Sequence, residues 1–270
     1  MRIARDLPSL RAELARLDRP ALVPTMGALH EGHLSLLAAA RREAAAIVAT
    51  IFVNPLQFGP QEDLARYPRD EAGDLAKLEA AGCDLVWMPS VEAMYPPGRA
   101  TGIVIGGPAE GWEDAARPGH FNGVATVCAK LFLQTGAAVA LFGEKDWQQL
   151  QVIRRMVLDL DLPLRIIGCP TVREADGLAL SSRNRFLDAG ERALAPALHA
   201  AMRQVAADLG AGMPAALAAA RESLAGRGFV VDYLALVEPA SLREEAAAPG
   251  RLIAAARLGG VRLLDNIAVG

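Results

Sequence analysis

The sequence predicts an α/β fold, in which a parallel sheet with helices on both faces precedes a smaller C-terminal α+β domain. Ile47–Val53 is a nearly continuous, β-branched apolar run, which is typical of a strand buried on both faces of a parallel sheet. This run follows a strand and an alanine-rich helical segment, and that order predicts a right-handed parallel unit. Beyond residue 171 the pattern changes to helices followed by antiparallel strands. We therefore expect two domains, residues 1–171 and residues 172–270.

The first domain alternates predicted strands and helices. A short amphipathic helix at Leu7–Leu17 leads into a strand that ends at Val23, and the next helix begins near His33. Thr101–Gly119 is irregular and glycine-rich, and so long a loop in a compact domain is typical of a lid or of disorder. The alternation is Rossmann-like, so ligands should bind beyond the carboxyl ends of the strands. Further strands are predicted at Ile47–Val53, Asp84–Met88, Ala137–Phe142 and Leu164–Val172, and helices within Asp63–Ala81, Val124–Leu133 and Trp147–Leu160.

The second domain is predicted to combine helices with an antiparallel sheet. Glu174–Asn184 is polar and rich in small residues, which favours a hinge between the domains. Asp188–Gly226 predicts two alanine-rich helices that separate near Gly210–Pro214. Three strands follow, the last two of them joined by a hairpin turn at Gly259-Gly260. These strands are predicted at Phe229–Val237, Arg251–Leu258 and Val261–Val269.

Composition excludes several classes of protein. The chain has 270 residues, 52% of them hydrophobic and 5% aromatic, which is a globular composition. A net charge of −3 argues against a nucleic-acid partner. Cys83, Cys128 and Cys169 lie among apolar neighbours, which predicts buried free thiols in a reducing compartment. Because no apolar signal core and no run of about 18 apolar residues occurs, the chain is expected to be soluble and cytoplasmic, without a membrane partner.

The stretch Pro24–Leu37 carries the strongest chemical pattern. Gly27 allows a sharp turn after a strand, and His30 and His33 then fall where the next helix begins. A helix start offers unpaired N–H groups and partial positive charge to a phosphate, and two imidazoles add donors. A lone histidine there is more often a cap or a surface residue, but the H-x-G-H spacing after a strand is more specific. It resembles the nucleotidyltransferase superfamily, where this motif holds the α-phosphate of ATP during adenylyl transfer.

Cations are needed beside the histidines because the sequence contains no glycine-rich phosphate loop of the usual kinds. Lys145 follows a predicted central strand at the same rim of the sheet as the histidines. A solvated surface lysine is the alternative interpretation. Ser181 to Arg183 offer two hydroxyls and a guanidinium, and an ordinary linker is the alternative there.

Seven blocks in order extend the resemblance along the chain. From Pro24 to Ile267, the chain closely resembles the pantothenate synthetase (pantoate–β-alanine ligase) family. That family's reaction condenses (R)-pantoate with β-alanine at the expense of ATP, through a pantoyl adenylate, and releases AMP and diphosphate. The blocks are PTMGALHEGH, FVNPLQFG, DLARYPR, RPGHFNGVATV, LFGEKDWQQL, TVREADGLALSSRN and RLLDNI.

The resemblance also implies residue roles. His33 corresponds to the family's proposed proton donor, and it would act with His30, Lys145, Ser182 and Arg183 in catalysis. Gln57 and Gln149 correspond to the glutamines that bind pantoate, with Gln57 also near β-alanine, while Gln148 is expected on the surface. The ATP site would be lined by Met26, Gly27, Ala28, Leu29, His30, Glu31, Gly32, His33, Gly143, Glu144, Lys145, Asp146, Val172, Leu180, Ser181, Ser182 and Arg183.

Metal, oligomer and domain motion follow as further expectations. Mg²⁺ should bridge the ATP phosphates. Where some family members carry an acidic pair and a glutamine, this chain has Gly73, Asp74 and Lys77, so Asp74 alone could ligate a second metal. The family resemblance implies a homodimer. The composition of Ser181–Asn184 favours a second domain that closes over the active site and shields the adenylate from water.

Two other functions fit parts of the pattern. One is a different adenylyl- or cytidylyl-transferring enzyme with the same H-x-G-H motif. Such an enzyme acting on a phosphorylated substrate should carry cations where Gln57 and Gln149 stand. The other is a non-catalytic nucleotide-binding protein, which would tolerate the loss of His30, His33 and Lys145, yet all three are present.

Overall fold

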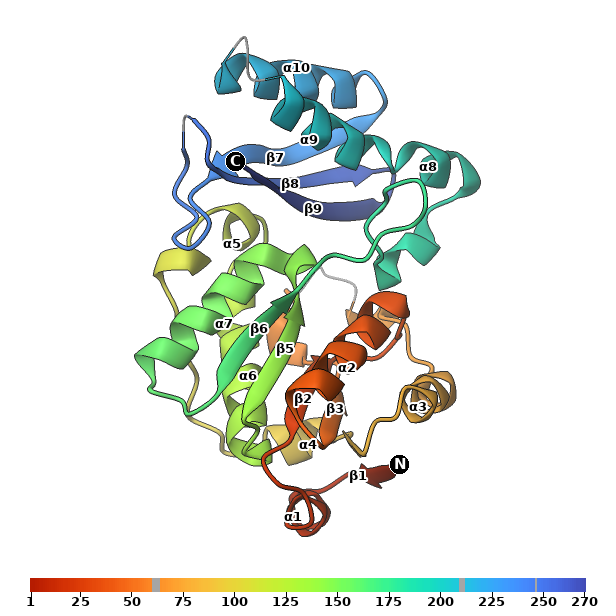
Figure 1. Cartoon of the computed structure of the whole chain (residues 1–270), viewed down its shortest axis with the longest axis vertical. Helices are drawn as coiled ribbons and strands as arrows, with labels where there is room; N and C mark the ends of the chain where they lie inside the picture. Colours follow the sequence, from red (N-terminus) through yellow and green to blue (C-terminus); the bar gives the residue numbers. More distant parts are fainter. Residues whose placement is uncertain (60–63, 209–211, 246) are drawn as a thin grey trace. The chain divides into compact units, whose positions relative to one another are not determined.

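The computed structural model describes residues 1–59, 64–208, 212–245 and 247–270 (Figure 1). These residues form two compact units. The first comprises Met1–Glu144 and Gln149–Pro170, and the second comprises Lys145–Gln148 and Thr171–Gly270. The short segment Lys145–Gln148 therefore belongs to the second unit, although the chain on either side of it belongs to the first.

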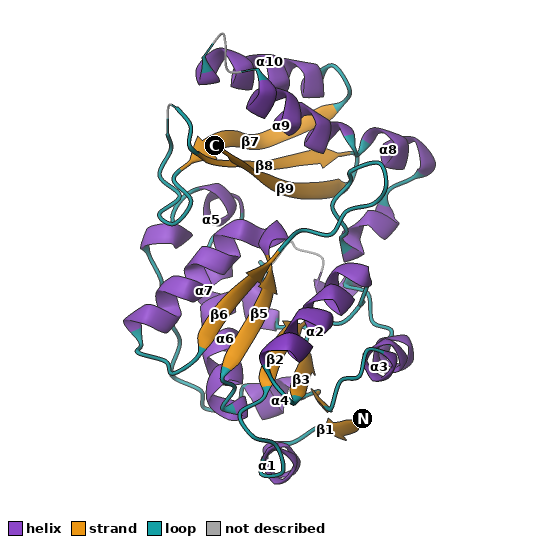
Figure 2. Ribbon diagram, in the orientation of Figure 1, coloured by secondary structure: helices purple, strands orange, loops and turns teal. Residues whose placement is uncertain are grey.

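The first unit is built on a six-stranded parallel sheet with strand order β1-β4-β3-β2-β5-β6. Strands are drawn in orange in Figure 2. The chain leaves β2 toward β3 on one side and later returns to β5 on the other. This reversal of direction at β2 is where open parallel sheets bind ligands. The strands are β1 (Arg2–Ala4), β2 (Ala21–Thr25), β3 (Ile47–Ile51), β4 (Leu85–Trp87), β5 (Val139–Gly143) and β6 (Arg165–Cys169).

Helices cover both faces of this sheet because alternate side chains of each strand point to opposite faces. On one face, Ala21 and Val23 share a buried cluster with Leu37 of α2 (Glu31–Glu43). On the other face, Trp87 donates its indole N–H to Gln134 of α6 (His120–Thr135), at 3.0 Å. The predicted α/β class with both faces covered is confirmed. The other helices are α1 (Leu7–Leu14), α3 (Glu71–Ala80), α4 (Val91–Met94), α5 (Trp112–Ala116) and α7 (Trp147–Asp159).

Several boundaries differ from the sequence-based predictions. β1 is not predicted at all, because three residues of an edge strand are too short for a periodic pattern. β2 continues through Pro24 to Thr25, and α2 begins at Glu31 rather than near His33. The helix predicted from Asp63 starts in a part of the chain outside the described residues.

The segment Thr101–Gly119 is irregular only in part, and its action as a lid stays a prediction. It contains a short 3-10 helix, η3 (Gly107–Ala109), and the helix α5. Its first part is tied to α6, because the N–H of Ile103 donates to Thr126 Oγ1 at 3.0 Å and that of Ile105 to Asn122 Oδ1 at 3.0 Å. The order of this part of the segment depends on these tertiary contacts. The sequence therefore has no periodic pattern from which it could be predicted.

The second unit has an antiparallel sheet in the order β7-β8-β9, with its own apolar core. The three predicted strands and the hairpin at Gly259-Gly260 are confirmed. Residues 188–226 contain three described helices instead of two, because Pro196 interrupts the first predicted helix. The Gly210 end of the predicted break lies outside the described residues. The elements are β7 (Phe229–Val237), β8 (Gly250–Leu258), β9 (Val261–Val269), α8 (Ala189–Leu194), α9 (Ala197–Ala207) and α10 (Met213–Ala225).

The stretch predicted as a hinge, Glu174–Asn184, is an ordered part of the second unit. Arg173 and Ala179 form an isolated antiparallel bridge, and the N–H of Glu174 donates to the carbonyl of Leu178 at 2.8 Å. Leu178 and Ala179 are buried. A polar composition is equally typical of a tight turn, so composition alone did not separate the two possibilities.

Two simpler expectations concern burial and hydropathy. Cys83, Cys128 and Cys169 are buried and form no disulfide, as predicted. None of the helices in the described part of the chain is both long enough and apolar enough to cross a membrane.

Candidate active site

The candidate site starts at the turn between β2 and α2. Gly27 (φ 83°) and Ala28 (φ 53°) adopt the left-handed conformation on which this turn depends. A Cβ on Gly27 would lie 2.9 Å from a carboxylate oxygen of Asp74, so a side chain there would force a shift. Thr25 fixes the strand end, because its Oγ1 donates to the carbonyl of Thr50 at 2.6 Å and accepts from the N–H of Gly27 at 3.1 Å.

Asp74, on α3, holds this turn from a distant part of the sequence. It is 1% exposed, and its two oxygens accept the N–H groups of Ala28 and Leu29, both at 2.7 Å. One turn later, Lys77 donates from Nζ to the carbonyl of Leu29 at 2.8 Å. An anion on two amides and a cation on the following carbonyl thus fix the backbone that leads to His30.

The two histidines form a reciprocal cap at the start of α2. His30 is the N-cap residue, and its Nδ1 accepts from the N–H of Gly32 at 3.1 Å. Nδ1 of His33 accepts from the N–H of His30 at 3.3 Å, and the ring centroids are 4.2 Å apart. Because both Nδ1 atoms are acceptors, each neutral ring carries its proton on Nε2. The cap therefore orients two Nε2–H donors beside a helix N-terminus, which suits an anion.

Gln57 lies beyond the carboxyl end of β3, on the 3-10 helix η1 (Pro55–Gln57), and is 9% exposed. Its Oε1 accepts from Asn54 Nδ2 at 3.0 Å, and its Nε2 lies 3.2 Å from Met26 Sδ. The buried Asn54 also accepts the hydroxyl of Tyr95 at 2.8 Å. Burial raises the pKa of Tyr95, so this hydroxyl remains a donor at neutral pH. The structure thus brings Gln57 to the turn that precedes the histidines.

Arg117 and His120 hold the backbone of Gln57 from another part of the first unit. The carbonyl of Gln57 accepts from Arg117 Nη2 at 3.2 Å and lies 2.9 Å from His120 Nδ1. Gly123 lets α6 approach this loop, because a Cβ there would lie 2.2 Å from the carbonyl oxygen of Leu56. The sequence-based predictions gave these residues no role, although the block that contains them is part of the family resemblance.

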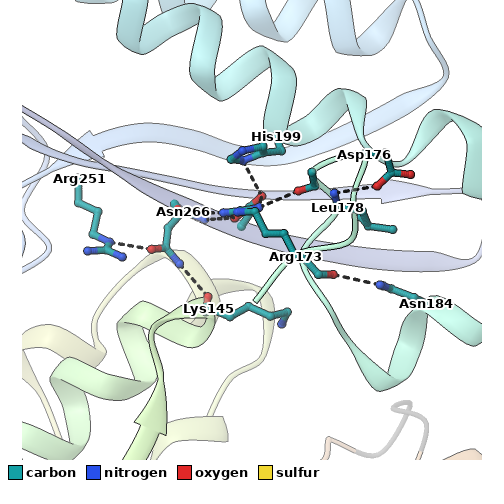
Figure 3. A network of polar contacts seen from close by, with 11 residues as sticks. Lys145, Arg173, Asp176, Leu178, Asn184, His199, Arg251 and Asn266 are labelled. Atoms are coloured by element: carbon teal, nitrogen blue, oxygen red, sulfur yellow. Dashed lines mark hydrogen bonds and ion pairs between the residues drawn. The ribbon is translucent and has the colours of Figure 1, made fainter. Parts of the chain in front are cut away.

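Lys145 lies in the short 3-10 helix η4 (Glu144–Asp146), directly after β5, and belongs to the second unit. Its Nζ lies 3.3 Å from Asp146 Oδ1, and its side chain is 19% exposed. Its carbonyl accepts from the side chain of Asn266 (Figure 3). The main chain at Lys145 is therefore fixed within the second unit.

The remaining predicted phosphate residues come together in one turn of the second unit. The N–H of Leu180 donates to the carbonyl of Val172 at 3.0 Å. Ser181 caps the 3-10 helix η5 (Ser182–Phe186), since its Oγ accepts from the N–H of Arg183 at 3.3 Å. Asn184 Nδ2 donates to the carbonyl of Ala179 at 3.0 Å. Hydrogen bonds therefore order the Ser-Ser-Arg segment.

The two neighbouring glutamines at the start of α7 differ in burial. Gln149 is half-buried and belongs to the first unit, together with both histidines and Gln57. Gln148 is 6% exposed, so its prediction as a surface residue is wrong. Adjacent helix positions face different directions, and the sequence did not show which of them faces the protein interior.

The residues that the structure describes do not form a metal-binding site of their own. They contain no group of three His, Cys, Asp or Glu side chains placed to hold an ion. Asp74, the expected ligand, already uses both oxygens on backbone amides. Asp74 therefore positions the turn in this structure, and a metal ion on its carboxylate stays a prediction.

In the first unit, a histidine pair caps the helix after the central strand of a parallel sheet, with a buried amide beside the preceding turn. This arrangement defines a nucleotide-binding α/β enzyme of the H-x-G-H type.

Comparisons with known proteins identify the family. A family model described as pantoate-beta-alanine ligase matches residues 2–268. Pantothenate synthetases from Granulibacter bethesdensis and Acidiphilium cryptum are 58% and 56% identical to this chain. The matches cover 99% and 100% of this chain, and 96% and 100% of those proteins. The chain belongs to the pantoate–β-alanine ligase family.

Solved structures agree with this assignment. The crystal structure of pantothenate synthetase from Thermus thermophilus matches with a TM-score of 0.94 and 50% identity, over 99% of both chains. The Francisella tularensis pantoate-beta-alanine ligase, complexed with beta-gamma ATP and beta-alanine, matches with a TM-score of 0.87 and 32% identity, over 99% of this chain and 97% of that one. The chain is thus an enzyme, a ligase that joins pantoate to β-alanine and forms pantothenate.

Proposed function

We propose that this enzyme activates pantoate with ATP and then transfers the pantoyl group to β-alanine. In the first step, a carboxylate oxygen of pantoate attacks the α-phosphorus of ATP, and the bond to the β-phosphate breaks to release diphosphate. In the second step, the amine of β-alanine attacks the acyl carbon of pantoyl adenylate. AMP leaves with the bridging oxygen, and the nitrogen loses a proton.

The reciprocal cap of His30 and His33 is the observation that carries this proposal. Negative charge builds on the α-phosphate during the first step, and donors already in place there lower the barrier. Because each Nδ1 is held by a backbone N–H, the rings have little freedom to turn their Nε2–H groups away. Asp74 and Lys77 support the position of the histidine rings, because they hold the backbone of Ala28 and Leu29 directly before His30.

Lys145, Ser182 and Arg183 are proposed to hold the phosphates that leave as diphosphate. Their chemistry fits, because an ammonium, a hydroxyl and a guanidinium are all donors to phosphate oxygens. The backbone of residues 26–33, 143–146 and 180–183, with Val172, is proposed to line the ATP site. The proposal that the second unit covers this site remains a prediction.

Gln57 and Gln149 are proposed to bind pantoate, with Gln57 also near β-alanine. A neutral amide bonds to hydroxyls and a carboxylate without the charge that would weaken the nucleophile. The contacts from Asn54, Arg117 and His120 support this role, because they fix both the side chain and the backbone of Gln57.

Mg²⁺ is proposed to enter with ATP as part of the substrate, because the described residues offer no cage of their own. It would neutralise charge on the phosphates, with phosphate oxygens and water as most of its ligands. The family resemblance supports a homodimer. The three buried free cysteines support work in a reducing cytoplasm.

Diphosphate release from ATP tests the proposal, measured with pantoate alone and then with β-alanine added. We expect a single-turnover burst of diphosphate with pantoate, and steady turnover with AMP release only when β-alanine is present. Absence of pantoate-dependent diphosphate in the presence of Mg²⁺ would contradict the adenylate route.

A further inference from the structure

The dipeptide Asp265-Asn266, near the end of β9, connects two segments of the second unit that are far apart in sequence. We infer that Asn266 is a positioning residue for Lys145, and that Asp265 anchors the same network through Arg173. This inference rests on the proposed function, because it assumes that Lys145 binds ATP phosphate.

Asn266 makes the central contact. It is 4% exposed, and its Nδ2 donates to the carbonyl of Lys145 at 2.8 Å. Its Oδ1 accepts from Arg251 Nε at 2.6 Å, as Figure 3 shows. Because both ends of the amide are used, its orientation is fixed, and the oxygen cannot replace the nitrogen opposite the carbonyl of Lys145. Because Asn266 is buried, the loss of either hydrogen bond would leave a polar group unsatisfied and lower the free energy of unfolding.

Arg251 supports the same segment a second time. Its guanidinium carbon lies 3.4 Å from the centroid of the Trp147 ring, two residues after Lys145. The indole N–H of Trp147 in turn donates to the carbonyl of Pro239 at 2.8 Å. The segment Lys145–Trp147 is therefore attached to the second unit through the carbonyl of Lys145 and the side chain of Trp147, although β5 and most of α7 belong to the first unit.

Asp265 anchors this network. Its two oxygens accept from the two terminal nitrogens of Arg173, both at 2.7 Å, and its Oδ1 also accepts the N–H of Asn266 at 2.7 Å. His199 Nδ1 lies 3.3 Å from Oδ2. Burial by itself would raise the pKa of Asp265, but the nearby His199 ring and the bonds from Arg173 outweigh it and hold the pKa below its ordinary value. Asp265 therefore stays ionised at neutral pH.

Arg173 carries the network to the second phosphate-binding segment. It also donates to the carbonyl of Gly177 at 3.0 Å, and it is bridged to Ala179. The carbonyl of Ala179 accepts from Asn184, which directly follows Arg183. The dipeptide thus fixes the Lys145 segment and the Ser181–Arg183 turn relative to each other within one unit. A displacement of about 1 Å in such a segment costs on the order of 100-fold in rate.

Two variants of Asn266 test the inference. Asn266→Ala removes both of these contacts, whereas Asn266→Asp keeps an acceptor for Arg251 and places a charged acceptor opposite the carbonyl of Lys145 in place of the donor. We expect both variants to raise KM for ATP and to slow pantoate-dependent diphosphate formation, by about tenfold or more. The reaction of supplied pantoyl adenylate with β-alanine should keep its wild-type rate. A general loss of structure would slow both half-reactions equally, and that result would overturn the inference.

Asp232→Asn is the matched control. Asp232 accepts from Arg262 Nε at 2.6 Å in the same sheet, and this bond is separate from the one that Asn266 donates to the carbonyl of Lys145. The control should lower thermal stability as Asn266→Ala does, and it should leave KM for ATP unchanged. An equal rise of KM in Asp232→Asn would show that any weakening of the sheet is sufficient, and it would overturn the inference.

Lys145→Ala, alone and combined with Asn266→Ala, separates this inference from the proposed function. If Asn266 acts through Lys145, the double variant should be no slower in diphosphate formation than Lys145→Ala alone. If the two losses multiply, the inference is wrong while the role of Lys145 stands. If Lys145→Ala keeps wild-type kinetics for ATP, the phosphate role of Lys145 fails, and the inference fails with it.

Discussion

Replacing Asp74 with asparagine should loosen the turn that carries the histidine pair. The side chain is isosteric, so packing at this 1% exposed position is preserved. One carboxylate oxygen becomes an NH₂ group that faces the N–H of either Ala28 or Leu29. One charge-assisted hydrogen bond is lost, and two donors oppose each other in a buried site.

The magnitude follows from that change. Removing one partner of a buried hydrogen bond costs about 1–3 kcal/mol, and a bond to a charged group lies in the upper part of that range. We expect the free energy of unfolding to fall by about 2–3 kcal/mol, or a Tm lower by roughly 4–10 °C for a chain of this size. Diphosphate formation should slow by about tenfold or more, because His30 follows the turn directly.

Thermal unfolding and the diphosphate assay measure both effects. Asp70→Asn is the control, because Asp70 caps the same helix at an exposed position by accepting from the N–H of Gly73, and asparagine caps equally well. Wild-type stability and rate in Asp74→Asn would refute the clamp. Recovery of activity at raised Mg²⁺ would also refute it, because a metal ligand would respond to the ion and a backbone clamp would not.

Three further predictions follow from other parts of the molecule. His33→Ala should slow diphosphate formation by at least about 100-fold, because it removes a donor and also the acceptor that caps His30; a fully active variant would contradict the role of the pair. Burial raises the pKa of all three thiols, that of Cys83 to about 11. A thiol-specific chromogenic reagent at about pH 8 should therefore label no cysteine in the native enzyme and three in denaturant. The pKa of Asp265 is lower in the folded than in the unfolded chain, so its ion pair stabilises the fold above about pH 4, and this stabilisation is lost as the pH falls through the folded pKa. The difference in free energy of unfolding between wild type and Asp265→Asn should therefore shrink in acid. A difference that stays constant with pH would contradict a lowered pKa.

The sheet and the position of the histidines could be predicted from the sequence, because both depend on local patterns. The apolar, β-branched run Ile47–Ile51 predicts a buried strand from its own residues alone, and the structure has a strand there. The turn at Gly27 needs a residue without a Cβ. The H-x-G-H spacing then places both imidazoles at one helix start, and the structure shows them capping that helix.

The residues that hold the site could not be predicted in the same way. Asp74 contacts Ala28 across 46 residues, and Asn266 contacts Lys145 across 121. No periodic pattern encodes such a pair, since only the folded chain brings the two atoms together. For the same reason, the sequence did not reveal the backbone clamp at Asp74, and it suggested a surface side chain at Gln148, where the structure has a buried residue.

Transfer of ¹⁸O from pantoate to AMP tests the central claim most directly. Pantoate labelled in its carboxylate is converted with ATP and β-alanine, and the AMP formed is analysed by mass spectrometry. Attack of the carboxylate on the α-phosphorus predicts one labelled oxygen in each AMP, because the acyl–oxygen bond breaks when the amine attacks. The other carboxylate oxygen stays in the amide of pantothenate by either route. Unlabelled AMP, with the transferred label found in diphosphate instead, would contradict the adenylate route.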